Sequence, residues 1–507
     1  MARRPFRALR DRPPHPSYDV VVVGAGVGGL VAAALLSRAG FSVLLVEQHY
    51  MVGGYCSTFR RRGFTFDAAT HFYPLLGNPQ ALTARLMAEL GVETRWVAMD
   101  PVDTFHLPDG SRFVVPADFE LYLERLFERF PAEREALNAF FAEVREAYLL
   151  GTLEYFRLRP TSRLDRFRSL TLREVLDRFF RDPALKLILT ADGPHWGSPP
   201  SRTSFVFDSM LRLSYFLGNY YPRGGSQAFA DDLARCVEQA GGEILMSSRV
   251  ERILVQGGRT TGVELETTRG PLAGRHSVAA RAVISNADLS LTLERLLPRE
   301  VVPDSALEPL RRLRTSFPCY LTHVGLRNVE GAVLERAQGY YWQSWDPDTV
   351  GRGGLRFKIF APTLYEPAMA PPGKQIVILQ KVLDLDYEGV SDWPSHKTEV
   401  ERYLLGELER EVPGIHSEIE VATTASALTS HRFTLNRRGV MLGWEMSPDQ
   451  LGDARPGIEG PVPGLWLTGH WVRPGGGITP VIVSAQQAAE AVAAELGAGS
   501  GAATREL

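Results

Sequence analysis

The sequence predicts an α/β protein of two interleaved domains, one of them built on a parallel sheet. Two observations support this. Near the N-terminus an apolar strand, a glycine-rich turn and an apolar helix follow one another, and similar α/β segments recur twice further along the chain. The segments between them have a different character. At 507 residues the chain is long enough to bury two sizeable cores.

Composition excludes several classes of function. A hydrophobic content of 44% and a charged content of 23% are ordinary for a globular protein. The net charge of −3 argues against nucleic acid as a partner, which calls for a basic excess. The three cysteines, Cys56, Cys236 and Cys319, form neither a disulfide framework nor a metal-ligand spacing. We therefore expect no metal site, and a reducing, cytoplasmic location.

We expect neither an export signal in the first 16 residues nor a membrane-spanning helix at 20–37. Five arginines lie in residues 1–16, but Pro13, Pro14 and Pro16 precede the first apolar run, so we expect a flexible basic arm. Residues 20–37 are uncharged, yet glycines divide them into strand, turn and helix rather than a membrane helix. The small-residue segment 497–507 is expected to be a flexible tail.

The first α/β segment contains the motif Gly-x-Gly-x-x-Gly between a strand at 19–23 and a helix ending near Ala39. In this motif Gly24 allows the tight turn, Gly26 lets the backbone approach a pyrophosphate, and Gly29 lets helix and strand pack closely. Glu47 ends the second strand, 42–46, where an acid accepts hydrogen bonds from ribose hydroxyls. The pattern predicts a Rossmann-like dinucleotide site, with NAD and FAD both open at this point.

The remaining segments alternate between two kinds. A helix capped by Ser226 precedes strands at 243–246, 250–255, 261–266 and 282–285, and a strand at 465–468 precedes a final Ala-rich helix. Between these segments lie a hairpin at 104–107 and 112–115, helices after Pro131, and a mixed β and α region. We assign 17–100, 221–299 and 432–496 to the dinucleotide domain, and 101–220 and 300–431 to a substrate domain.

The residues after Glu47 favour FAD. Gly53-Gly54, the run Cys56–Phe59 and the run Gly63–Asp67 form a second turn that simple NAD dehydrogenases do not need. Here the chain resembles the flavin amine oxidase and phytoene desaturase superfamily. The likeness recurs at 221–226, at Val250, at 284–288 and at 465–484, in the family's order. The resemblance implies FAD bound by Gly24, Gly26, Gly28, Gly29, Glu47, Gly53, Gly54, Val250, Asn286, Gly469, His470, Gly476, Gly477 and Ile478.

Within the superfamily, the chain is most similar to phytoene desaturases, carotenoid isomerases and retinol saturases. The runs Gly53–Phe59 and Phe66–His71 resemble the saturase and isomerase branch in particular. One position departs from the family: His470 stands where the family usually has Asp or Glu. His470 either donates to the cofactor phosphate or is a neutral replacement. In both cases the details of cofactor binding are open, and the FAD interpretation stands.

The segments assigned to the substrate domain lack a Ser-His-Asp arrangement and a paired acid and base. They are rich in aromatic residues, which suit an apolar polyene, although such clusters also form plain core. We expect a substrate tunnel from Phe207, Tyr215, Tyr221, Tyr341 and Trp342. The catalytic candidate is His71, as a proton relay, with a structural role as the alternative. His195 and Arg473 are weaker candidates.

The resemblance therefore implies an FAD-dependent oxidoreductase that acts on a long hydrophobic isoprenoid of the carotenoid type, by desaturation or redox-neutral cis-trans isomerisation. The alternatives are saturation of a polyene or retinoid, amine oxidation, in which Lys358 would have to reach the site, and a non-catalytic prenyl-lipid carrier. Peripheral contact with the inner face of a membrane follows only from the substrate. The polyene, the electron acceptor and the oligomeric state are open.

Overall fold

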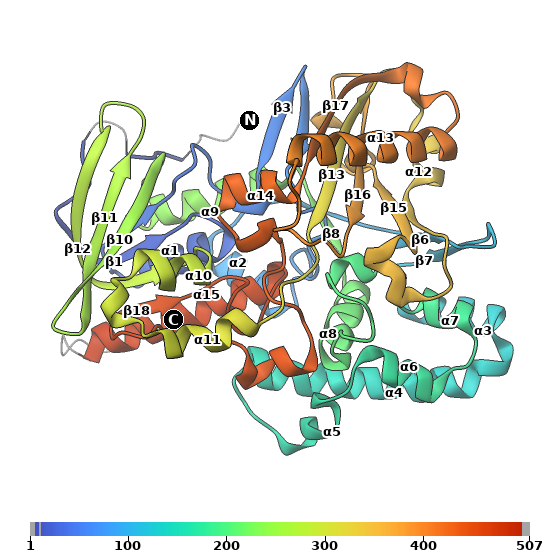
Figure 1. Ribbon diagram of the computed structural model, residues 1–507, viewed down its shortest axis with the longest axis horizontal. Coiled ribbons are helices and arrows are strands. Elements are labelled where there is room, and N and C mark those ends of the chain that lie inside the picture. The colour runs from blue at the N-terminus through green and yellow to red at the C-terminus, as the bar shows by residue number, and fades with distance from the viewer. Residues whose placement is uncertain (1–5, 10–11, 499–507) are drawn as a thin grey trace.

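The computed structural model describes residues 6–9 and 12–498, which form two large sheets covered by helices (Figure 1). The α/β class predicted from the sequence is confirmed. The predicted tail, 497–507, falls almost entirely outside the described residues, as does part of the predicted arm, 1–16. No helix in the described ranges is both long and apolar enough to cross a bilayer.

The first sheet has the strand order β10-β11-β12-β1-β2-β9, with β18 beside β12. Its centre is parallel, because β1 pairs in parallel with both β12 and β2, whereas β10, β11 and the first half of β12 form an antiparallel extension. The strands are β1 (Ser17–Val23), β2 (Val43–Val46), β9 (Glu243–Leu245), β10 (Ser248–Gln256), β11 (Arg259–Thr267), β12 (Gly274–Ser285) and β18 (Leu465–Leu467).

Both faces of this sheet are covered. Side chains alternate along β1, so Val20 and Val22 pack against helices while Val21 and Val23 pack on the opposite side. The first face is covered by α1 (Val27–Arg38), α2 (Leu82–Leu90), α9 (Ser226–Gln239) and α15 (Ile478–Ala498). The carboxyl ends of the parallel strands, where ligands bind in such sheets, point toward the second domain (Figure 1).

The second sheet has the order β17-β13-β16-β15-β14-β6-β7 and is antiparallel except where β14 pairs with β6. It joins the hairpin near residue 110 to strands from beyond residue 318, so both assigned pieces of the substrate domain contribute to it. The strands are β6 (Asp103–His106), β7 (Arg112–Val115), β13 (Cys319–Leu326), β14 (Gly339–Trp342), β15 (Leu355–Phe360), β16 (Gln375–Val382) and β17 (Ile419–Ala425).

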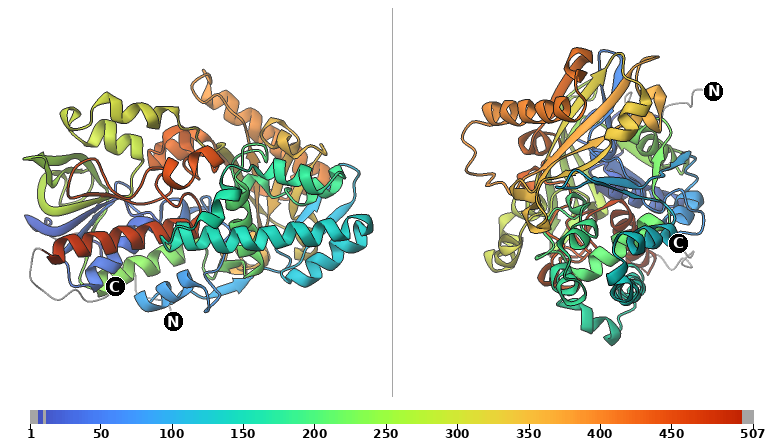
Figure 2. Two further views of the ribbon diagram at one scale, coloured as in Figure 1. Left: turned by 90° about the horizontal axis from the view of Figure 1, so that it is seen from below. Right: turned by 90° about the vertical axis from the view of Figure 1, so that its right-hand side faces the viewer.

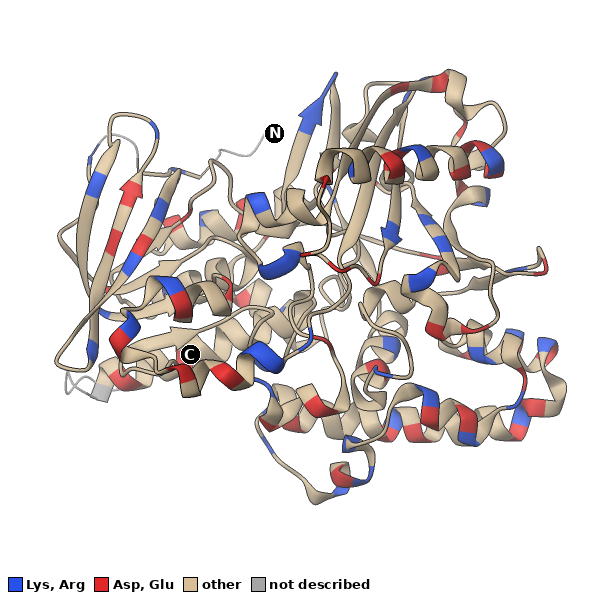
Figure 3. Cartoon of the chain, in the orientation of Figure 1, with Lys and Arg blue, Asp and Glu red and all other residues tan. Residues whose placement is uncertain are grey.

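Helices cover both faces of the second sheet. Helices α12 (Gly331–Ala337) and α13 (Trp393–Glu411) pack on one face. The other face meets the helical layer, which comprises α3 (Phe119–Arg129), α4 (Arg134–Gly151), α5 (Asp165–Arg168), α6 (Leu172–Phe179), α7 (Pro183–Ile188) and α8 (Phe205–Phe216). In Figure 3, α4 and α13 carry charges of both signs along their length, whereas α15 is almost free of them.

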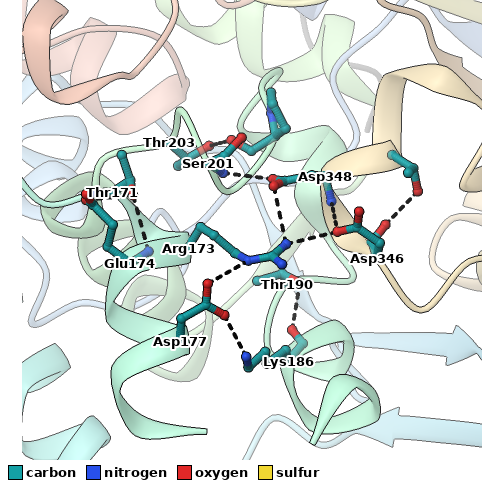
Figure 4. Close-up of polar contacts among 12 residues, drawn as sticks. Thr171, Arg173, Glu174, Asp177, Lys186, Thr190, Ser201, Thr203, Asp346 and Asp348 are labelled. Carbon is teal, nitrogen blue, oxygen red and sulfur yellow. Dashed lines mark hydrogen bonds and ion pairs between the residues drawn. The ribbon is translucent and has the colours of Figure 1, made fainter. Parts of the chain in front are cut away.

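A charged cluster ties the helical layer to the loop after β14. Arg173 of α6 contacts Asp346 at 2.9 Å and Asp348 at 3.3 Å (Figure 4). Asp177, one turn further along α6, pairs with Arg173 and also with Lys186 of α7. Because these pairs are solvated, we expect each to add little to stability.

The two domains are in contact through two long helices. In the left view of Figure 2, α4 and α15 follow one another across the molecule, and Gln487 of α15 contacts the carbonyl oxygens of Tyr155 and Phe156, which follow α4. The connecting elements are β3 (Thr58–Arg61), β4 (Phe64–Asp67), β5 (Trp96–Ala98), β8 (Tyr220–Pro222), α10 (Leu289–Leu291), α11 (Asp304–Arg312) and α14 (Ala427–Thr434).

Three local details differ from the sequence expectations. The N-cap of α9 is Gly225, and Ser226 is its first residue, whose hydroxyl donates to the Thr70 carbonyl. Leu307 of α11 packs with the first sheet, although the helix falls in the range given to the substrate domain. Part of the arm is also fixed: the Leu9 amide donates to the Ile244 carbonyl at 2.8 Å.

Candidate active site

A cavity of about 1630 Å³ extends from the glycine-rich turn after β1 to the helical layer under the second sheet. Its wall contains Gly24 and Glu47 at one end, and Phe207, Met210 and Tyr215 of α8 at the other. Sites for one drug-sized ligand have volumes of roughly 300–1,000 Å³. This cavity therefore has room for a dinucleotide and a second, largely apolar ligand.

The glycine-rich turn leaves no space for side chains. Gly24 has a φ of +93°, and a Cβ added to Gly29 would lie 2.0 Å from the Gly24 carbonyl oxygen. A Cβ at Gly28 would lie 2.5 Å from Oδ1 of Asn286, which follows β12 and donates to the Gly24 carbonyl. The turn thus presents bare backbone and the N-terminus of α1 to the cavity, a suitable cradle for a pyrophosphate.

Glu47 is held at the carboxyl end of β2 by the backbone. Its carboxylate accepts hydrogen bonds from the Ala25 amide at 2.7 Å and the His49 amide at 2.8 Å. Burial raises its pKa, and these two bonds oppose that shift. Val250 of β10 lies in the same part of the cavity wall, and the Gly53 amide donates to the Ala25 carbonyl at 2.8 Å. The two predicted glycine turns are therefore adjacent, with Gly54 also in the wall.

The C-terminal motif closes the opposite side of this cradle. The Gly469 amide donates to the Ser484 hydroxyl at 3.0 Å, and a Cβ at Gly476 would lie 2.3 Å from the Leu442 carbonyl oxygen. Gly476, Gly477 and Ile478 line the cavity where α15 begins. The N-terminus of this long helix therefore adds a partial positive charge to the cavity wall.

His470 also lies in the cavity wall and carries an unsatisfied atom. Its Nε2 is buried and has no hydrogen-bond partner among the described residues. Burial lowers its pKa to about 3, so the imidazole is neutral near pH 7. An unpaired buried polar atom is costly, and a ligand that supplies a hydrogen-bond partner would remove that cost. The residues present thus fit a dinucleotide cofactor.

His71 lies in the cavity wall as a neutral imidazole. Its Nδ1 donates to the Ala69 carbonyl at 2.8 Å, and its ring stacks on Phe360. Burial, with a contribution from the charge of Lys358, lowers its pKa to about 3. A protonated His71 is therefore not available as an acid near neutral pH, although its Nε2 is free of the Ala69 contact.

Of the five predicted tunnel residues, two line the cavity and three lie outside its wall. Phe207 and Tyr215 line the cavity. Tyr221 lies outside the wall, with its hydroxyl bonded to Asp67. Trp342 is buried with its indole donating to the Ala191 carbonyl, and Tyr341 lies on the far face of the second sheet. These three assignments need correction. Alternation along β14 turns Tyr341 to the far face, whereas Trp342 and Tyr221 are engaged by Ala191 and Asp67.

Two further predicted candidates have clear positions. Arg473 pairs with exposed Asp453, so it faces the surface. His195 lines the cavity and makes hydrogen bonds to two tyrosines.

Sequence reasoning missed Arg455. It is 2% exposed, donates to the carbonyl oxygens of Trp444 and His470, and contacts no carboxylate within the described part of the chain. Burial lowers its pKa to about 9, so it stays charged at pH 7. A Cβ on Gly475 would lie 3.4 Å from its guanidinium carbon. Arg455 therefore places a buried positive charge beside the turn at Gly475. No sequence motif predicts this position, because packing alone brings Arg455 to the turn.

A dinucleotide cradle that opens into a long cavity beneath a second, sheet-based domain defines a two-domain flavoenzyme. The chain belongs to the family described as flavin containing amine oxidoreductase, whose model matches residues 27–493. It is thus a flavin-dependent oxidoreductase, as the sequence analysis predicted.

Curated relatives are similar over most of their length. Prolycopene isomerase from Daucus carota is 26% identical, with 95% of this chain and 80% of the isomerase covered. All-trans-retinol 13,14-reductase from Danio rerio is 25% identical, covering 91% and 84%. The zeta-carotene-forming phytoene desaturase of Myxococcus xanthus is 27% identical, covering 93% of each chain.

Solved structures share the fold. An oxidoreductase from Methanosarcina mazei has a TM-score of 0.65 at 19% identity, covering 93% of this chain and 99% of that protein. Wild-type putrescine oxidase with bound putrescine has a TM-score of 0.66 at 15% identity, covering 95% and 99%. At these identities the likeness shows the two-domain fold alone.

Proposed function

We propose that this protein is an FAD-dependent oxidoreductase that acts on a long, hydrophobic isoprenoid of the carotenoid type. The reaction is desaturation or redox-neutral cis-trans isomerisation, and saturation of a polyene or retinoid is the alternative. The observation that carries the proposal is the single long cavity, which joins the dinucleotide cradle to an aromatic end at α8. The curated relatives support it, since their names describe an isomerase, a retinol reductase and a phytoene desaturase.

FAD is favoured as the flavin because the cradle is built for a dinucleotide. The N-terminus of α1 and the bare backbone at Gly26 and Gly28 suit a pyrophosphate. Glu47, Val250 and His470 line the cavity. In this proposal Glu47 accepts from ribose hydroxyls, Val250 contacts adenine, and His470 donates from Nε2 to the phosphate-ribityl region. Gly53, Gly54, Asn286, Gly469, Gly476, Gly477 and Ile478 complete the proposed binding residues.

The chemistry belongs mainly to the cofactor, which when bound supplies or accepts a hydride. The chain supplies position and electric field. The N-terminus of α15 and the buried charge of Arg455 both lie at the glycine turn 475–477, so both favour negative charge on a group held there. This field would stabilise the reduced cofactor without a dedicated acid.

The apolar end of the cavity favours a polyene over an amine. Phe207, Met210 and Leu211 of α8 and Phe72 contribute side chains to this wall. Lys358, the lysine on which an amine oxidase interpretation depends, is 1% exposed, pairs with Asp103 and does not line the cavity. A prenyl-lipid carrier is the remaining alternative, and it would not need the intact cradle.

We also propose that the protein docks on the cytoplasmic face of a membrane. Leucines on and beside segments of the cavity wall are exposed, with Leu149 at 60% and Leu158 at 61%. Arg157 and Arg159, also exposed, flank Leu158. Exposed apolar side chains beside basic ones are typical of surfaces that bind anionic lipid. An apolar substrate dissolved in the bilayer would then reach the cavity without crossing water. Leu82, Leu153 and Leu217 are also exposed. We propose that they form one docking surface with Leu149 and Leu158, and we call the five residues the leucine surface.

The test of the cofactor and substrate class uses the purified protein. Heat-released cofactor is identified by chromatography, and we expect FAD rather than FMN. The protein is then incubated anaerobically with phytoene and with cis and all-trans carotenes, with oxidised and with reduced flavin. A mass change of two hydrogens indicates desaturation or saturation, by its sign. A change in retention at constant mass indicates isomerisation. If every polyene is unchanged in both redox states, the substrate class is wrong.

A further inference from the structure

A chain of buried polar side chains leads from the second sheet to the substrate end of the cavity. Lys358 on β15 lies 3.1 Å from Asp103 and 2.8 Å from the Tyr340 hydroxyl. The Tyr340 hydroxyl lies 2.7 Å from Nε2 of His195, and Nδ1 of His195 lies 2.6 Å from the Tyr215 hydroxyl. His195 and Tyr215 line the cavity. The chain is continuous, with every link at hydrogen-bond distance.

The donors and acceptors fix the direction of this chain. A lysine ammonium has only donors, so the Tyr340 oxygen accepts from Lys358. The one hydroxyl proton of Tyr340 is then available for Nε2 of His195. A neutral imidazole that accepts at Nε2 carries its proton at Nδ1, and it donates to the Tyr215 oxygen. The hydroxyl proton of Tyr215 is left over, and Tyr215 lines the cavity.

Burial keeps the intermediate groups in the states that this direction requires. The pKa of His195 is well below its usual value, first because of burial and then because of the charge of Lys358. Burial also lowers the pKa of Lys358, while the nearby carboxylate of Asp103 opposes that shift. The lysine thus loses a proton more readily than an exposed one. Its ammonium also lies 4.0 Å from the centre of the Phe72 ring.

A small second cavity lies beside the chain. Its volume is about 30 Å³, and its wall includes His195, Tyr215 and Asp103, together with Asp192 and Arg212. One water needs roughly 10–15 Å³ and two to four polar partners, so the space suits a water. Such a water would connect the chain to further acidic groups. The charged and titratable groups that face the chain are therefore Asp103, Asp192, Asp208, Arg212, Cys319 and His71.

We propose that Tyr215 is the residue that exchanges a proton with a carbon of the substrate, and that His195, Tyr340 and Lys358 supply that proton in sequence. This inference rests on the proposed function. Tyr215 is the catalytic residue in this scheme, and the other three are positioning residues that act through it. Neutral His71, on the same cavity wall, is then not required as the acid.

Protons and electrons balance in each of the three reactions named in the proposed function. In saturation, one alkene carbon would receive the Tyr215 proton, and its neighbour would receive the hydride that a bound, reduced flavin would supply. Each group of the chain passes on one proton, and Lys358 ends neutral. In desaturation the same transfers run backward, starting from neutral Lys358. In isomerisation the proton is added to the polyene and a proton is removed again, with no net change in electrons.

Removing single hydroxyl groups tests the proposal, because Tyr→Phe changes keep the packing. The variants are Tyr215→Phe and Tyr340→Phe. Tyr341→Phe is the matched control, since it is the next residue of β14, is 4% exposed and faces the opposite side of the sheet. Each is assayed in deuterated water with the polyene that the wild type converts. Product deuterium is measured by mass, together with kcat and KM.

We expect solvent deuterium in the wild-type product of a saturation or an isomerisation; in a desaturation the substrate loses the proton, so kcat carries the test. We expect Tyr215→Phe to lower kcat by about 10²–10⁴-fold with KM unchanged, the range for loss of a general acid. Tyr340→Phe should lower kcat less, and Tyr341→Phe should match the wild type. Wild-type kcat in both test variants, or a saturated or isomerised wild-type product without solvent hydrogen, overturns the inference and leaves the proposed function standing.

A second readout does not depend on turnover. In protein labelled with ¹⁵N-histidine, with the His195 signal assigned by His195→Gln, we expect a proton on Nδ1 and none on Nε2. Tyr340→Phe should abolish that preference, and Tyr341→Phe should retain it. The opposite tautomer in the wild type overturns the chain's direction even if no polyene is converted, in which case the proposed function fails separately.

Discussion

Gly29 shows how a single missing side chain determines the cofactor cradle. It lies in the first turn of α1, where the helix crosses the Gly24 carbonyl. The sequence motif was sufficient to predict this turn because its requirement is local: strand, turn and helix are adjacent in the chain. Gly406 in α13 offers the contrast, because a Cβ added there would meet open space.

Gly29→Ala should therefore displace α1 from β1, since its Cβ would lie 2.0 Å from a backbone oxygen. We expect loss of most bound flavin and lower thermal stability, measured by flavin absorbance per protein and by the melting temperature. Gly406→Ala is the matched control. It should retain flavin and stabilise the protein by about 0.5–1 kcal/mol, since alanine favours the helix. Full flavin content in Gly29→Ala would contradict the cradle described here.

Asp67, at the end of β4, gives a prediction about pH. It is 1% exposed, accepts from the Ser226 amide at 2.8 Å and from the Tyr221 hydroxyl, and burial raises its pKa to about 6 from 3.8. The folded protein thus holds this proton at a pH where the unfolded chain has released it. The group's contribution to stability is complete below about pH 3.8 and is lost as the pH rises through about 6.

Asp67→Asn cannot titrate and should remove this dependence. Between pH 3.8 and about 6, we expect the wild-type free energy of unfolding to fall relative to the variant by up to about 1.4 kcal/mol per pH unit. Urea unfolding of both proteins across this window measures the difference. Parallel pH curves for the two proteins would show that Asp67 titrates normally.

At the scale of elements, α8 has two roles: it lines the cavity, and it holds the helical layer together. Asp208 and Arg212, one turn apart on α8, form a pair in which the side chains are 0% and 7% exposed. Arg212 also donates to the Leu189 carbonyl after α7. A buried charge that loses its partner is costly, whereas a solvated one is not.

Asp208→Asn should therefore destabilise the protein by about 3–5 kcal/mol, because it leaves the Arg212 charge buried and unpaired. Arg173→Ala, in the solvated cluster of Figure 4, removes several ion pairs but should cost about 1 kcal/mol or less. Urea unfolding of both variants measures this contrast. Equal losses in the free energy of unfolding would indicate that burial does not determine how much these ion pairs contribute to stability.

The second sheet shows why part of the site could not be predicted. Tyr340 and Tyr341 are adjacent, yet alternation along β14 places Tyr340 in the polar chain and Tyr341 among α12 and α13. Residues 103, 195, 215, 340 and 358 are far apart in the chain. Pairing of β14 with β6 and β15 brings residues 103, 340 and 358 together, and the helical layer adds residues 195 and 215. No sequence motif encodes these contacts.

At the scale of the whole molecule, the sequence is sufficient to predict the order of the domain segments along the chain. It is not sufficient to predict the cavity and the leucine surface, to which both domains contribute. Blocks of the dinucleotide domain could be recognised because each is a contiguous motif with a backbone function. The cavity walls and the leucine surface come from segments of both domains, so only the fold reveals them.

Replacing Leu149, Leu153 and Leu158 together by glutamate should weaken binding to vesicles of equal parts phosphatidylcholine and phosphatidylglycerol. The change removes exposed apolar surface and adds charge of the same sign as the lipid. Co-sedimentation measures the bound fraction. Leu121→Glu on α3, 40% exposed and outside the leucine surface, is the matched control and should bind like the wild type. Unchanged binding of the triple variant would remove the docking proposal.

The most direct test of the central claim is an anaerobic titration of the purified protein, with the flavin spectrum and the product mass recorded in one sample. Phytoene and carotenes are compared with a set of amines that includes putrescine. We predict flavin absorbance bands, conversion of at least one polyene in the oxidised or reduced state, and no response to amines. Rapid flavin reduction by an amine, with every polyene unchanged, would contradict the account.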